Sequence, residues 1–237
     1  MTKTTPTNLE RIDDELDVLS AMVPLAGQHI VELGCGAAQL ARALLVRFPD
    51  SELTGIEVDE RQHAKNLASP QQRLHFVAGV AQDIPAGDAA FDLALMLKSL
   101  HHVPIRSMGK ALNEVARVLR PDGHLYLSEP VYAGALNEVV KPYNDEGVVR
   151  AAAQEAIDAA LQGNTWTQQA QRRFVIPRRF ADFADFEKRM IQQTYADHRL
   201  DEATLAEVRR RFDSNLGADG GACFEQPMLV RLLRRKG

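Results

Sequence analysis

A turn with two glycines is the segment of this chain best suited to bind a ligand. Residues 31–38 read Val-Glu-Leu-Gly-Cys-Gly-Ala-Ala. Gly34 and Gly36 lack the Cβ atoms that would keep a ligand away from the backbone. Glu32 precedes the turn, and Glu57 follows about 20 residues later, the spacing at which a carboxylate binds the hydroxyls of a ribose. These residues predict a cofactor site.

Two classes of cofactor use such a turn, and one residue separates them. A dinucleotide site has a third glycine three residues after the second, which packs the helix closely on the strand. That position holds Gln39 in this chain. The acid at position 32 also suits a cationic amino-acid group better than a pyrophosphate. The pattern therefore favours S-adenosylmethionine over a dinucleotide.

Two adjacent histidines are the candidate catalytic residues. His101 and His102 follow an apolar segment, and either could act as a general base or stabilise a turn. Consecutive side chains point apart, so we expect no metal site there. Cys35, between the glycines, is expected to be a small buried turn residue and not a nucleophile.

Apolar runs alternate with amphipathic stretches along the first half of the chain. The pattern predicts strands at 29–33, 53–58, 74–77, 91–97 and 124–128, and helices at 9–23, 37–48, 61–67 and 107–119. Nearly continuous apolar strands are typical of a parallel sheet covered on both faces. We expect a Rossmann-like, doubly wound α/β fold of about seven strands, mostly parallel with an antiparallel last strand.

The alternation ends after Pro130. Residues 131–179 contain no clear strand. The pattern predicts helices at 136–143, 148–161 and 202–212, and a further helix after Phe180. It also predicts a sixth strand at 188–193 and a last strand at 227–233. We expect a single domain, 1–237, with a cofactor-binding core at 9–130, a mainly helical insert at 131–200 and a closing segment at 201–237.

The composition restricts the partners and the location. The chain has 237 residues, 45% of them hydrophobic, a net charge of −4 and two cysteines. No apolar run reaches the roughly 20 residues that span a bilayer. The acidic balance disfavours a nucleic-acid partner, and we expect a cytoplasmic monomer or homodimer that does not bind membranes.

The order of these motifs resembles the class I S-adenosylmethionine-dependent methyltransferases, in particular those that act on small molecules. The resemblance covers residues 10–130: the glycine motif at 31–38, an acidic-loop motif at 55–59, a segment like G-D-A-x-x-L-P at 77–85, the fourth strand and its turn at 91–102, and a turn like L-x-P-G-G-x-L at 119–125. It implies methyl transfer from S-adenosylmethionine, with S-adenosylhomocysteine as the product and no metal.

The resemblance also implies roles for individual residues. The backbone of Gly34, Cys35 and Gly36 would contact the methionine part and the ribose, with Glu32 near the amino group. Glu57 would bind the ribose hydroxyls. The remaining positions are the adenine neighbours Val58, Val80 and Ala81, and Met96 and Leu97 near the sulfonium.

One residue departs from the family pattern. Many relatives have Asp at position 80, where it binds the adenine amino group, and this chain has Val80. Either Gln82 or Asp83 replaces that contact, or apolar packing and the backbone hold the adenine.

The acceptor is less well determined by the sequence. Residues expected to line its pocket are Glu129, Tyr132, Tyr143, Trp166 and Arg178. Aromatic rings with arginines suit a small acidic or aromatic acceptor, although the same residues could form a lid packed on the core. We expect transfer to O, N or C of a small molecule. The alternatives are an RNA- or protein-directed methyltransferase and a non-catalytic S-adenosylmethionine-binding protein.

Overall fold

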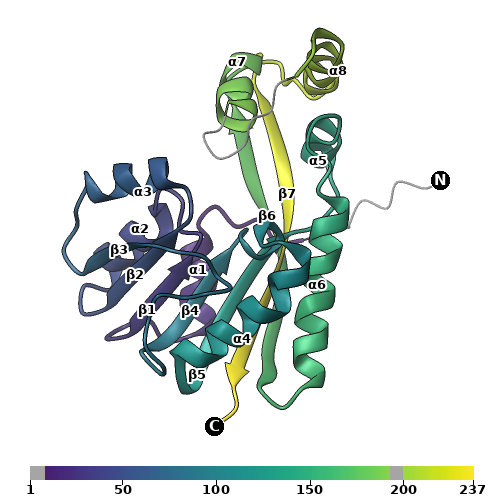
Figure 1. The fold of residues 1–237 in the computed structure, drawn as a ribbon. Helices are drawn as coiled ribbons and strands as arrows, with labels where there is room; N and C mark the ends of the chain where they lie inside the picture. Colours follow the sequence, from purple (N-terminus) through teal and green to yellow (C-terminus); the bar gives the residue numbers. More distant parts are fainter. Residues whose placement is uncertain (1–8, 193–199) are drawn as a thin grey trace. The chain divides into compact units, whose positions relative to one another are not determined.

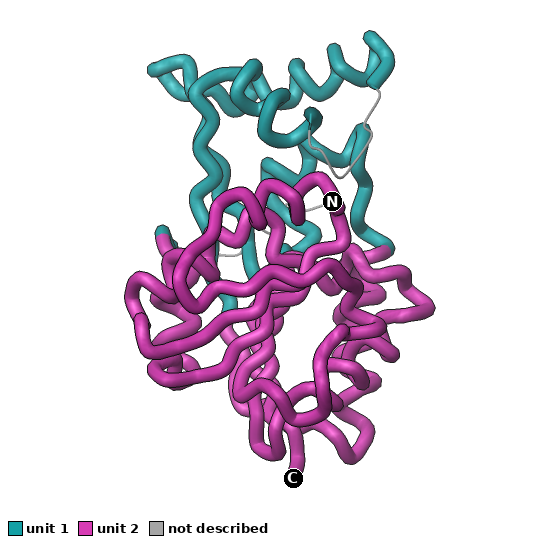
Figure 2. Tube along the Cα trace, turned by 60° about the vertical axis from the view of Figure 1, so that its left-hand side comes forward, with its two compact units in different colours: residues 1–13, 130–148, 173–228 teal, residues 14–129, 149–172, 229–237 magenta. Residues whose placement is uncertain are grey.

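The computed structural model describes residues 9–192 and 200–237. The chain forms two compact units (Figure 2). Unit 2 comprises Asp14–Glu129, Val149–Arg172 and Leu229–Gly237, and unit 1 comprises Met1–Asp13, Pro130–Val148 and Arg173–Met228.

One sheet contains all seven strands (Figure 1), in the order β3-β2-β1-β4-β5-β7-β6. The strands are β1 His29–Leu33, β2 Glu52–Glu57, β3 Leu74–Ala78, β4 Phe91–Leu97, β5 Leu119–Pro130, β6 Trp166–Phe180 and β7 Ala222–Arg235. Strands β1 to β5 pair in parallel, and β7 is antiparallel. The expected α/β fold, with about seven strands and an antiparallel last strand, is confirmed.

Helices connect the strands as the alternation predicts. They are α1 Glu15–Met22, α2 Gln39–Arg47, α3 Glu60–Leu67, α4 Met108–Val118, α5 Ala135–Val140, α6 Gly147–Gln162, α7 Phe183–Phe186 and α8 Glu202–Asp213, with short turns η1 Leu100–His102 and η2 Ile105–Ser107 and a π-helical turn η3 Glu187–Ile191. Helices α5 and α6 directly follow β5.

Alternation along the strands divides the side chains of unit 2 between two faces of the sheet. The first face carries apolar residues that pack with α4 and α6 in one core: Val31, Leu33, Ala94, Met96, Leu125 and Leu127. The other face carries Glu32 of β1, which is in register with Leu95 of β4, itself in register with Tyr126 of β5. This second face therefore holds polar groups inside the fold.

Unit 1 has its own apolar core, which is mainly aromatic. Five phenylalanine rings pack with edge-to-face, tilted and stacked geometry, and they come from β6, α7, α8 and β7: Phe180, Phe183, Phe186, Phe212 and Phe224. Such pairs each contribute about 0.5–1.5 kcal/mol beyond their buried area.

The structure corrects three expectations for the elements. Residues 9–14 are not helical, because the backbone of Ile12 donates to Val175 of β6 and α1 begins only after Asp14, whose carboxylate accepts from Leu16 N. Residues 131–179, expected to lack a strand, contain most of β6. The sixth strand predicted at 188–193 is wrong, because Glu187–Ile191 is helical and residue 193 lies outside the described residues.

Candidate cofactor site

The glycine turn follows β1 directly and is fixed to the end of β2. The amides of Gly34 and Cys35 both donate to the carbonyl of Ile56, at 2.9 and 3.1 Å. Gly34 has φ +71°, and a Cβ atom there would lie 3.0 Å from Cβ of Ser99. Only glycine combines this left-handed backbone with this close approach. The turn after β4 therefore packs against the glycine turn.

Glu57, at the end of β2, is held in place by three backbone amides. Its Oε2 accepts from Gly36 N at 2.7 Å, and its Oε1 accepts from Val58 N and Asp59 N, both at 2.9 Å. A carboxylate offers about four acceptor positions, so Oε2 keeps room for one more donor. One hydroxyl of a ribose could use that remaining acceptor position.

Asn66 is a buried residue that the sequence analysis missed. Its Nδ2 donates to the carbonyl of Gly36 at 2.7 Å, and its Oδ1 accepts from Gln62 at 3.0 Å. The residue is 3% exposed. Asn66 thus connects α3 to the glycine turn. No local pattern marks it, because its partner is 30 residues away along the chain.

Glu32 is buried beneath the turn. Burial raises its pKa from 4.5 to about 8; Lys98 opposes this shift, and Glu15 and Glu57 add to it. Its Oε2 atom is buried and has no hydrogen-bond partner in the described part of the chain. A buried carboxyl group without a partner is costly unless a ligand satisfies it. The site therefore fits a ligand with cationic N–H donors.

Cys35 lies in the same turn but is not suited to be a nucleophile. Burial, followed by the charges of Glu32 and Glu57, raises the pKa of its thiol to about 12. The reactive thiolate is therefore suppressed. The position of Cys35 agrees with its expected role as a buried turn residue.

The segment expected to face adenine is anchored by an ion pair. Arg117 of α4 donates to the carbonyls of Ile84 and Ala86 at 2.9 and 2.8 Å, and Glu114 accepts from Ile84 N at 3.1 Å. Glu114 in turn accepts from Arg117 at 2.9 Å. Sequence reasoning missed both residues, which hold the loop that carries Val80 and Ala81.

The other residues expected near adenine and sulfur lie around the same ends of the strands. Val58 is 67% exposed, which leaves its apolar side chain available to a ligand. Asp59 caps α3 by accepting from Arg61 N at 3.0 Å. Met96 is buried, whereas Leu97 is half-buried and is in register with Ser128.

His101 forms a buried pair with Glu129. Its Nδ1 contacts Oε2 of Glu129, and Oε1 of Glu129 accepts from Leu100 N at 2.9 Å. Each of the two side chains is 3% exposed. A carboxylate beside Nδ1 favours the tautomer with the proton on that nitrogen, which leaves Nε2 as the accepting nitrogen. The arrangement can work as an acid–base pair.

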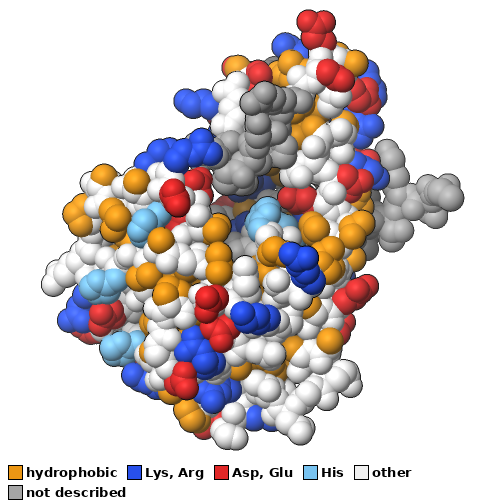
Figure 3. Space-filling model, viewed as in Figure 1, with side chains coloured by type: hydrophobic (Ala, Val, Ile, Leu, Met, Phe, Trp, Pro, Cys, Tyr) orange, Lys and Arg blue, Asp and Glu red, His pale blue; other side chains and the backbone are white. Residues whose placement is uncertain are grey.

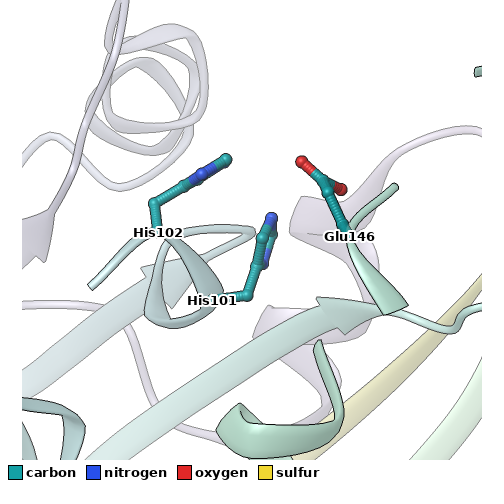
Figure 4. Close-up of side chains that lie close together, drawn as sticks. All are labelled: His101, His102 and Glu146. Carbon is teal, nitrogen blue, oxygen red and sulfur yellow. The ribbon is translucent and has the colours of Figure 1, made fainter. Parts of the chain in front are cut away.

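His102 lies beside His101 but in a different environment. Figure 4 shows the two imidazoles on the turn after β4, and their ring centroids are 4.1 Å apart. His102 is exposed, whereas His101 is buried. Glu129 therefore orients His101, and Glu129 itself, expected to face the acceptor, is engaged by two groups of its own unit.

The remaining residues expected at the acceptor are divided between the two units. In unit 1, Tyr132 donates to Asp145 at 2.6 Å and Tyr143 donates to the carbonyl of Met190 at 3.3 Å. Arg178 lies in β6, also in unit 1. Trp166 belongs to unit 2 and is buried in its core, only 2% exposed.

The glycine turn and strands β2 to β4 lie within a segment that matches a known family. The family described as "Methyltransferase domain" matches residues 31–127. S-adenosylmethionine is the cofactor that this family implies. The match ends two residues before the first segment of unit 2 does.

Two curated relatives and one solved structure are similar to the chain. An O-methyltransferase from Penicillium expansum is 33% identical over 129 residues, 52% of this chain and 44% of that protein. A 27-O-demethylrifamycin SV methyltransferase from Amycolatopsis mediterranei is 35% identical over 119 residues, 48% of this chain and 43% of that protein. The chain thus spans less than half the length of either relative. The YcgJ protein from Bacillus subtilis has the same fold, with a TM-score of 0.67 and 17% identity over 94% of this chain and 98% of that one.

Proposed function

We propose that the chain transfers a methyl group from S-adenosylmethionine to an oxygen of a small molecule. The observation that carries this proposal is the buried pair between Glu129 of β5 and His101, which lies on the turn that packs against the glycine turn. Transfer to oxygen needs a base when the acceptor is a hydroxyl that must lose its proton. The names of the two relatives also describe O-methylation.

In this proposal some residues of the chain bind the cofactor, and others remove a proton from the acceptor. S-adenosylmethionine supplies a methyl group on a sulfonium sulfur, which is already activated for transfer. Gly34 and Gly36 admit the cofactor to the backbone, and Glu57 accepts from its ribose. The backbone at Met96 and Leu97 lines the sulfur. His101 accepts the acceptor's hydroxyl proton at Nε2, and Glu129 stabilises the imidazolium at Nδ1.

Adenine recognition is the part of this proposal that departs from the family pattern. Val58, whose side chain is exposed, would pack on the ring, and Val80 and Ala81 would hold it from the loop that Arg117 anchors. Apolar packing and the backbone would then replace the acid that many relatives have at position 80.

The acceptor is a small molecule, and Tyr132, Tyr143 and Arg178 of unit 1 are the side chains that we expect to select it. Arginine and tyrosine suit an acidic or phenolic acceptor. We assign Trp166 to core packing, because its ring is buried among residues of α4 and α6.

A comparison of two histidine variants tests the assignment of the base. The full chain is incubated with labelled S-adenosylmethionine and a panel of phenols and hydroxy acids, and S-adenosylhomocysteine binding is measured in parallel. We expect His101→Gln to lower kcat by about 10²–10⁴-fold with unchanged binding of the product. His102→Gln is the matched control and should retain most of the activity. Full activity of His101→Gln would exclude His101 as the base.

Further expectations belong to this proposal. We expect a cytoplasmic monomer or homodimer. We also expect methyl transfer to need no metal, so activity should survive treatment with a chelator. An RNA-directed activity is disfavoured by the net charge of −4 and by the surface in Figure 3, where Lys and Arg are interspersed with Asp and Glu. Among the described residues, none of the helices has the length and apolarity to cross a membrane.

A further inference from the structure

Two histidines and a glutamate lie together where the first three strands of the sheet begin. Strands β1, β2 and β3 are neighbours in the sheet (Figure 1). His29 is in register with Glu52. His75 is in register with Thr54, which lies two residues beyond Glu52 on β2. Residues two apart on a strand share a face, so His29, Glu52 and His75 lie on one face of the sheet.

Both imidazoles contact the carboxylate of Glu52, one at each oxygen. Nε2 of His75 lies 2.9 Å from Oε1. Nδ1 of His29 lies 3.8 Å from Oε2. The side chains of His29, Glu52 and His75 are 52%, 42% and 58% exposed. Water and small ions can therefore reach all three groups, and the two rings have room to turn.

The backbone that carries these side chains is fixed by the sheet. The amide of His29 also donates to Oδ2 of Asp92 at 2.9 Å. The other oxygen of Asp92 pairs with Arg120, so this neighbouring acid is already engaged and its charge is balanced. Side chains on strands are held more precisely than side chains on loops. Rotation of side chains alone can therefore bring the three groups to one ion.

These three groups match the ligands of a divalent transition metal. Imidazole nitrogen and carboxylate oxygen bind Zn²⁺ at about 2.0–2.2 Å, so two such ligands of a tetrahedral ion lie about 3.4 Å apart. The distances from the two imidazoles to Glu52 lie on either side of this value. Since the imidazoles contact different oxygens, the His29 ring must turn toward the oxygen that faces His75. Imidazole suits zinc, copper and nickel, whereas Mg²⁺ and Ca²⁺ prefer oxygen ligands.

We propose that His29, Glu52 and His75 form a zinc site at the amino ends of β1, β2 and β3. Two imidazoles and one carboxylate supply three ligands, and water fills the fourth position. The ion joins three neighbouring strands and stabilises unit 2. It takes no part in methyl transfer, because the glycine turn follows the other end of β1, about 13 Å away along the strand.

Calorimetry of the full chain with ZnCl₂ tests the site at about pH 7.5, where a histidine of ordinary pKa is neutral and can bind metal. We expect saturable binding to the wild type. Loss of even an outer-shell partner lowers metal affinity about 10–100-fold. Loss of a ligand in His29→Gln, Glu52→Gln or His75→Gln should therefore weaken zinc binding by at least about tenfold. MgCl₂ should give no saturable heat.

A histidine elsewhere in unit 2 provides the matched control. His102 is exposed and lies beside His101. His102→Gln therefore removes an accessible imidazole but keeps the three ligands, and it should bind zinc as the wild type does. Thermal melting gives a second measurement: zinc should raise the melting temperature of the wild type but not that of Glu52→Gln. Circular dichroism in the presence of a chelator confirms that each variant is folded.

Three outcomes would overturn the assignment. The folded wild type could give no saturable heat with zinc, or Glu52→Gln and His75→Gln could bind zinc as the wild type does. Zinc binding that His102→Gln abolishes would place the ion at the histidine pair after β4 instead. Because no cofactor enters this experiment, its failure would leave the proposed methyl transfer unaffected.

Discussion

The buried carboxyl group of Glu32 makes a quantitative prediction about pH. Its pKa is about 8 in the folded protein and 4.5 in the unfolded chain. Between these values the folded state keeps a proton that the unfolded state releases. The folded state therefore binds more protons, and stability must fall as pH rises through this window. The groups that face it are Lys98, Glu15 and Glu57.

The size of the effect follows from the pH interval. Each pH unit within the window changes the free energy of unfolding by about 1.4 kcal/mol. From about pH 5.5 to about pH 7.5, Glu32 should therefore cost about 3 kcal/mol of stability. Glu32→Gln removes the titrating group but keeps its shape. The variant should lack this part of the pH dependence.

Urea unfolding of wild type and Glu32→Gln at both pH values provides the assay. Contributions from other titrating groups are common to both proteins and cancel in the difference. The stability of the variant relative to the wild type should rise by about 3 kcal/mol between the two pH values. An identical pH dependence in both proteins would refute a buried, protonated Glu32.

Cofactor binding should reverse this protonation. An ammonium group beside Glu32 favours the carboxylate, so binding below about pH 8 releases a proton. Calorimetry with S-adenosylhomocysteine in buffers of different ionisation enthalpy counts the protons released. We expect about one proton for the wild type near pH 6.5 and none for Glu32→Gln. Equal proton counts would contradict the assignment.

Three substitutions test other contacts of the site. Gly34→Ala should abolish S-adenosylhomocysteine binding in calorimetry, because its Cβ meets Ser99 at 3.0 Å, whereas Gly27→Ala, at φ +69° with open space around it, should bind normally despite losing about 1–2 kcal/mol of stability. Asn66→Ala should weaken the binding of S-adenosylhomocysteine about tenfold, because the carbonyl of Gly36 loses its hydrogen bond. Unchanged affinity would show that this hydrogen bond does not position the glycine turn. Arg117→Met should lower the melting temperature and weaken binding of adenosine-containing ligands, and normal affinity in the destabilised variant would remove its link to the adenine loop.

Sequence patterns predicted the core of the fold because its strands are buried on both faces. Residues 29–33 and 91–97 were predicted with the bounds that the structure gives. Strand β6 was missed because it lies at the end of the strand order and is largely polar. Edge strands commonly carry charges and proline, and β6 includes Arg172, Arg173 and Pro177. Neither an apolar run nor strict alternation marks such a strand.

The start of the chain shows a second limit. Leu9 and Ile12 follow helical spacing, but Ile12 pairs with the backbone of Val175, far away in the sequence. The periodicity of a short segment cannot show that a distant strand competes for its backbone. Tertiary pairing here overrides the local pattern.

The residues of the cofactor site also fall into those that the sequence predicted and those that it did not. Ordered motifs indicated Glu32, the glycines and Glu57, because the turn after a strand has a readable spacing. Asn66 and Lys98 were not predicted, since each acts across the fold: Asn66 on Gly36 and Lys98 on Glu15. Their sequence neighbours give no sign of these partners.

The interleaving of the two units limits how this protein can be re-engineered. Unit 1 is made of three separate stretches of chain, and residues 149–172 return to unit 2 between two of them. The family match at 31–127 falls wholly within the first stretch of unit 2. A chimera that imports unit 1 from a relative must therefore exchange several segments together. A single crossover after residue 130 would also replace residues 149–172 and 229–237 of unit 2, and would split the core of unit 2 between two parents.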